Sequence, residues 1–169
     1  MEKSIIIKKT SISLSELFIN NIEVLHKDGI LDSIESIETI NINKINENKI
    51  EINRKVKAKK LLPDFINKLI PTNNTDKIYC YKENAILEYN TENYHIYSFT
   101  HISELSYYNI EGKIEFNYIN DNINIKIFIK CIINNNNIPL KKVLEHKITD
   151  IVIQSYIRLF KKIENKYSI

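Results

Sequence analysis

The sequence predicts an α+β fold in which a curved antiparallel β-sheet wraps around a long C-terminal helix. Segment 123–133 places isoleucine or cysteine at every odd position, while its even positions include asparagine and lysine. Alternation of this kind is typical of a strand with one covered and one solvated face. Segment 138–167 has no helix breaker after Pro139 and carries a regular apolar stripe, so it predicts a helix long enough to cover the sheet.

A short strand and an amphipathic helix are expected at the start of the chain. The strand is the run of isoleucines at positions 5–7. Ser13 followed by Glu16 forms a capping box, which marks a helix start, and Gly29 supplies a helix stop. One helical face between them is apolar and contains Leu14, Leu17, Phe18, Ile22 and Leu25. The pattern therefore predicts a single first helix.

A hairpin and a short helix are expected next. Segments 33–43 and 48–60 alternate as two strands around a polar turn. The inward phase of the second strand carries Arg54 together with the apolar residues Ile50, Ile52, Val56 and Ala58. Segment 62–70 breaks the strand pattern, because Pro63 suits a first helical turn and the apolar residues after it follow a helical stripe. We therefore expect a short helix inserted between strands.

The chain then returns to strands and ends in the long helix. Alternating runs separated by Asn and Asp turns predict an antiparallel meander, with strands at 77–84, 85–90, 93–102, 105–120 and 123–133. The apolar stripe of the last helix is expected to contain Leu140, Leu144, Ile148, Ile151, Val152, Leu159 and Ile163. A twisted sheet of this size tends to curl around the helix that covers it.

Size and composition exclude several classes of protein. With 169 residues and an apolar fraction of 43%, the chain can build one sizeable core, and we expect a single domain spanning residues 1–169. The net charge of +3 is small and both signs are interleaved, so no nucleic-acid partner is expected. No apolar run is long enough for a signal peptide or a membrane span, which predicts a cytoplasmic location. Cys80 and Cys131 stand alone, so no disulfide framework, zinc site or other cofactor is predicted.

The order of these elements resembles that of a known superfamily. The chain is similar to the START-like helix-grip superfamily of lipid-transfer and pollen-allergen domains. The similarity lies in segment 54–71, in the meander after it, and in segment 138–163 with its "IPL" start and Glu145. The resemblance covers nearly the whole chain, and the single first helix is a departure from the family pattern. It implies a cavity between the long helix and the concave sheet, occupied by a lipid or another small apolar molecule.

Arg54 is the first candidate contact for such a ligand. It lies in the inward phase of an otherwise apolar strand, where an unpaired charge is unfavourable. Its guanidinium group suits a polar or phosphate head group. Alternatively, the strand ends or bulges at this position, or Arg54 pairs with a carboxylate such as Glu88 or Glu115.

Other candidate ligand contacts come from the rest of the predicted fold. They are Phe65 and Leu69 in the short helix, Tyr81 and Tyr107 in the meander, Ile125, Ile127 and Ile129 in the last strand, and Val152, Ser155 and Leu159 in the last helix. Ser155 interrupts the helix stripe, and a small residue there either leaves room for a ligand or allows close approach to the sheet. Tyrosines can line an apolar pocket, but they are also ordinary strand formers.

The short helix offers a route for ligand uptake. Together with the lysines of segment 55–60 it could touch an anionic membrane surface transiently while a ligand enters. Lysines in this arrangement are also typical of the solvated face of a strand.

The sequence identifies no catalytic constellation. Its four histidines do not have metal-ligand spacing, and it contains no nucleophile elbow or glycine-rich phosphate loop. The leading hypothesis is therefore a protein that binds, and could transport, a lipid or other hydrophobic small molecule. The second is a non-catalytic interaction or structural module with a filled core. The third is an enzyme acting on an apolar substrate, which would need a reactive pair inside the cavity.

Overall fold

The strands form an antiparallel sheet in the computed structural model, which describes residues 1–19, 22–27, 30–31, 34–59, 78–104 and 108–169. Seven strands lie in the order β1-β7-β6-β5-β4-β3-β2. Their bounds are β1 (Glu2–Lys8), β2 (Ile34–Asn46), β3 (Lys49–Lys59), β4 (Ile78–Thr91), β5 (Tyr94–Ser103), β6 (Tyr108–Ile119) and β7 (Asn122–Ile133). Every neighbouring pair is antiparallel, and β1, the first strand in the chain, lies beside β7, the last.

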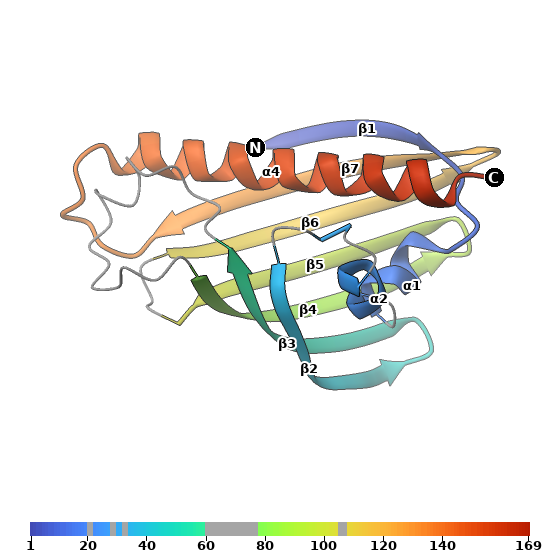
Figure 1. Cartoon of the computed structure of the whole chain (residues 1–169), viewed down its shortest axis with the longest axis horizontal. Coiled ribbons are helices and arrows are strands. Elements are labelled where there is room, and N and C mark those ends of the chain that lie inside the picture. Colours follow the sequence, from blue (N-terminus) through green and yellow to red (C-terminus); the bar gives the residue numbers. More distant parts are fainter. Residues whose placement is uncertain (20–21, 28–29, 32–33, 60–77, 105–107) are drawn as a thin grey trace.

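The described helices are α1 (Leu14–Ile19), α2 (Ile22–Lys27) and α4 (Lys141–Tyr167). Figure 1 shows α4 running along the β7 side of the sheet, whereas α1 and α2 lie nearer to the β2 and β3 side. The Phe18 ring in α1 lies 4.8 Å from that of Tyr97 in β5 and 6.1 Å from that of Phe160 in α4, measured between centroids. The helix α1 therefore packs between the sheet and α4, and the predicted α+β helix-grip architecture is confirmed.

Strand β7 presents its apolar side to α4, as its alternation predicts. All six odd-numbered side chains from Ile123 to Ile133 are buried, with at most 5% of their surface exposed. They pack with Leu144, Ile148 and Ile153 of α4 in the same core. At about 25 cal/mol for each Å² of buried apolar surface, such a row supplies a large share of the hydrophobic stabilisation of this face.

Hydrogen bonds also fix α4 on β7. Strand β1 pairs with β7 only as far as residue 128, and Ile129 N–H donates to the Met1 carbonyl. Beyond that point, Cys131 N–H donates to Thr149 Oγ1 at 3.1 Å and Ile133 N–H donates to Glu145 Oε1 at 2.9 Å. Side chains of α4 thus satisfy backbone donors that would otherwise lack a partner in the sheet.

The first helical segment and the start of the meander differ from prediction. The structure has two short helices, α1 and α2, where the sequence pattern predicts one. Residues 20 and 21, which separate the two helices in the sequence, lie outside the described residues. The predicted strands 77–84 and 85–90 form the single strand β4, because Asn84 is paired within the ladder rather than in a turn. The predicted helix at 62–70 lies outside the described residues.

The buried face of α4 is rotated slightly from the predicted stripe. Leu140 precedes the helix, has a left-handed φ of 58°, and is 70% exposed. Ile153 and Phe160 are fully buried instead. Ile151, Val152 and Leu159 are only half-buried, so the helix turns part of its apolar surface away from the close-packed core. Among the described helices, none has the length and apolar character needed to cross a membrane.

Candidate functional site

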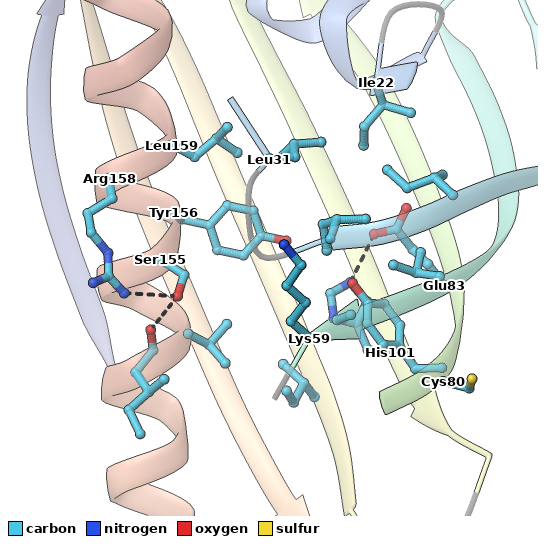
Figure 2. A pocket seen from close by; sticks show the side chains of 18 of the residues that line it. Ile22, Leu31, Lys59, Cys80, Glu83, His101, Ser155, Tyr156, Arg158 and Leu159 are labelled. Atoms are coloured by element: carbon cyan, nitrogen blue, oxygen red, sulfur yellow. Dashed lines mark hydrogen bonds and ion pairs between the residues drawn. The ribbon is translucent and has the colours of Figure 1, made fainter. Parts of the chain in front are cut away.

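A cavity of about 720 Å³ lies between α4 and the sheet, and side chains of α1 and α2 contribute to its wall (Figure 2). Its lining is mainly apolar and includes Phe18, Ile22, Val56, Ile110 and Leu159. This volume falls in the range of pockets that bind small molecules, about 300–1,000 Å³. The half-buried side of α4 described above is the side that borders the cavity.

The predicted contact residues separate into three groups. Tyr81, Val152, Ser155 and Leu159 line the cavity. Ile125, Ile127 and Ile129 do not line it; they are at most 2% exposed and lie in the core, where α4 packs directly on β7. Phe65, Leu69 and Tyr107 lie outside the described residues. These three isoleucines of β7, which the sequence suggested as ligand contacts, are therefore covered by α4.

Arg54 is buried beside the cavity rather than lining it. Its side chain is inaccessible to solvent, and Nη1 donates a hydrogen bond to Glu83 Oε1 at 2.9 Å. Nη2 donates to the backbone carbonyls of Phe18 and Ile19 at the end of α1. Strand β3 continues through this position without a break, and Glu83 lies directly opposite Arg54 in the register of β3 and β4.

Arg54 does pair with a carboxylate, which was one alternative from the sequence, but neither of the two examples suggested there is its partner. Glu88 pairs with Lys49 and Glu115 pairs with Lys113, both at 2.6 Å and near the surface. Glu83 has the same phase in β4 as Ala85 and Leu87, which are buried. Every second side chain of a strand points to the same face, and this alternation could have identified Glu83 as the inward carboxylate.

Glu83 accepts hydrogen bonds through both oxygens. Oε1 accepts from the Tyr97 hydroxyl as well as from Arg54, and Oε2 lies 2.9 Å from Nε2 of His101. An ionised carboxylate only accepts, so Nε2 of His101 carries the proton in this contact. Glu83 and His101 both line the cavity, and the sequence analysis missed both as site residues.

These contacts determine the charge of the Glu83 carboxyl group. Burial alone would raise its pKa, but His101 and Arg54 outweigh burial and lower the pKa to about 2. Burial, and then the Glu83 charge, raise the pKa of Tyr81 and of Tyr156 far above the ordinary tyrosine value. The described lining of the cavity therefore includes an ionised but internally neutralised carboxylate and the neutral phenols of Tyr81 and Tyr156.

The lowered pKa of Glu83 predicts a specific loss of stability in acid. A depressed folded-state pKa contributes stability above the unfolded value of 4.5, and this contribution is lost as the pH falls towards about 2. Between pH 5 and pH 3 the wild type should lose about 2 kcal/mol more of its unfolding free energy than the variant Arg54→Met/Glu83→Gln. Urea denaturation at each pH measures this difference, and parallel pH profiles for the two proteins would contradict it.

His101 is held in place by aromatic rings as well as by Glu83. Its ring lies 4.5 Å from those of both Tyr81 and Phe99, measured between centroids. The Phe99 ring lies against Gly112 on the neighbouring strand, where a side-chain Cβ would overlap it. Gly112 thus allows Phe99 to lie flat against the sheet and support His101.

Basic side chains lie where the cavity meets solvent. Lys59 of β3 and Arg158 of α4 are exposed lining residues, and Lys162 of α4 is a half-buried one. In Figure 2 the Lys59 side chain points across the cavity towards Tyr156, and Arg158 lies beside Ser155. Among the described residues, no cluster of histidine, cysteine and carboxylate side chains could hold a metal ion.

Comparison with known proteins adds evidence on the fold. No protein-family model matches the sequence, and no curated protein is significantly similar to it. The crystal structure of TTHA0849 from Thermus thermophilus is similar with a TM-score of 0.60 and 13% identity, covering 98% of this chain and 94% of that one. The crystal structure of Ara h 8.0201 is similar with a TM-score of 0.50 and 12% identity, covering 96% of this chain and 98% of that one. These similarities show that the chain shares the α+β helix-grip fold of these two structures.

Proposed function

We propose that the chain binds a small hydrophobic molecule in the cavity between α4 and the sheet. The observation that carries this proposal is a space of about 720 Å³ with a mainly apolar lining. Side chains that line a cavity lack protein packing partners on one side, so an apolar occupant would gain dispersion contacts and remove apolar surface from water. The resemblance to lipid-transfer and pollen-allergen domains supports a lipid, or a molecule of similar polarity, as the occupant.

The alternative of a filled core applies to only one part of the interface between the sheet and the helix. Close packing fills the space between β7 and α4, where Ile125 and Ile127 are fully buried. On the side towards β3 and β4, by contrast, Val152 and Ser155 of α4 border the cavity. This difference along one helix favours the binding function over a purely structural role.

Native mass spectrometry tests the proposal directly. The mass of freshly purified protein under native conditions is compared with its denatured mass, and any adduct is identified after solvent extraction. A bound apolar molecule, or uptake of one from a lipid mixture, is the expected result. An adduct-free protein that takes up no lipid and associates with itself as its concentration rises would instead support the interaction module. Transfer of the bound molecule between membranes is the further step, measured between donor and acceptor vesicles.

A further inference from the structure

We infer that the cavity selects an anionic amphiphile: an apolar tail packs inside, and a negatively charged head group lies against Lys59 and Arg158 at the rim. This inference rests on the proposed function, because it specifies the charge of the molecule that occupies the same cavity. It is carried by the positions and partners of the charged residues that line the cavity.

The described lining residues include one carboxylate, and that carboxylate is already neutralised. Glu83 Oε1 contacts Arg54 and its Oε2 contacts His101, each at 2.9 Å. No other acidic side chain lines the cavity in the described part of the chain. A cationic head group would therefore find no free counter-charge among the described residues of the wall to compensate its desolvation.

Two basic groups at the rim, by contrast, lie apart from the carboxylates that the structure describes. Among the described residues, no carboxylate lies within ion-pair distance of Lys59 or Arg158. The described hydrogen bond of the Arg158 side chain goes to Ser155 Oγ at 3.4 Å, which leaves most of its donors available. Both side chains are exposed, so a head group held there would remain at the edge of the cavity.

The spacing along α4 also favours an anion. Arg158 and Lys162 are four residues apart, so they are neighbours on the helix surface, and both line the cavity.

Displacement of a neutral fluorescent probe tests two things separately: binding in the apolar cavity and preference for an anionic head group. The probe N-phenyl-1-naphthylamine reports on the apolar cavity without carrying a charge. It is displaced in turn by dodecanoate, dodecyl phosphate, dodecanol and dodecylamine, which share one tail and differ in the head group. We expect both anions to displace it at concentrations about tenfold lower than dodecylamine, with a preference that weakens as NaCl is raised. The ratio of the two anions distinguishes a carboxylate from a phosphate head group.

Charge-removing variants locate the head group. Lys59→Gln and Arg158→Gln should each weaken dodecanoate binding by about two- to fivefold, the size expected for one exposed ion pair, and leave dodecanol and the probe unchanged. Lys57→Gln is the matched control, because Lys57 is an exposed lysine of the same strand that does not line the cavity. Normal probe binding without preference for anions, or with a preference that both variants retain, would overturn this inference and leave the proposed function intact. Absence of probe binding would contradict the proposed function itself.

Discussion

Replacing Arg54 with methionine is expected to lower the unfolding free energy by about 3–5 kcal/mol. The substitution leaves the Glu83 carboxylate, which is 6% exposed, without the guanidinium group that it pairs with. It also removes the hydrogen bonds that Arg54 donates to the carbonyls of Phe18 and Ile19. Urea denaturation followed by circular dichroism measures the loss.

Two further variants separate a buried ion pair from a general effect of the substitution. Lys49→Met removes a surface ion pair between the same two strands, since Lys49 lies directly opposite Glu88 in the register of β3 and β4. Lys49 Nζ lies 2.6 Å from Glu88 Oε1, and both side chains are about a third exposed. Its removal should change the unfolding free energy by less than about 1 kcal/mol. The double variant Arg54→Met/Glu83→Gln removes both buried charges and should recover at least half of the loss caused by Arg54→Met. If Arg54→Met were as mild as Lys49→Met, the buried pair would not contribute as described.

The position of Arg54 connects this stability to the cavity. Its guanidinium group joins the end of α1 to Glu83 in β4, and Phe18 of α1 and Glu83 are both lining residues. Arg54 therefore fixes the distance between two walls of the cavity without contacting its interior. The sequence hypothesis that Arg54 meets a head group identified an important inward charge, and in the structure this charge is paired with Glu83 beside the cavity.

The sequence was sufficient to predict the fold because its dominant signals are periodic. The alternation of Ile123 to Ile133 and the unbroken helical pattern after Pro139 do not depend on where the local turns lie. Boundaries were harder to predict: Asn84 has the composition of a turn but lies inside β4, where a paired neighbour on each side satisfies its backbone. Local propensity is weaker than ladder pairing at such positions.

The candidate site was only partly predictable, for a geometric reason. Periodicity shows which side chains point inward, but not how far apart the two facing layers lie. Ile127 and Val152 both have the inward phase, yet Ile127 packs against α4 and Val152 borders a cavity. Glu83 and His101 also share the inward phase of their strands, but their pairing depends on the register between β4 and β5. One strand pattern alone does not specify that register.

Filling the cavity from α4 is expected to have the largest effect on binding. In Ser155→Phe the aromatic ring replaces a small side chain that lines the cavity. The Ser155 hydroxyl donates to the Ile151 carbonyl within the same helix at 2.9 Å, so its loss breaks no described hydrogen bond between α4 and the sheet. The affinity for N-phenyl-1-naphthylamine should fall at least tenfold, or by about 1.4 kcal/mol. The unfolding free energy should change by less than about 1 kcal/mol, because the ring enters existing space.

The neighbouring residue provides the matched control. Gln154 is exposed on the outer side of α4, so Gln154→Phe adds the same ring to the same helix without entering the cavity. Probe binding should remain at the wild-type level in this variant. Val152→Phe fills the cavity from one turn earlier and should reproduce the loss seen with Ser155→Phe. Normal binding in both filled variants would place the ligand elsewhere, whereas loss in both, with Gln154→Phe unaffected, would leave the space beside α4 as the binding site.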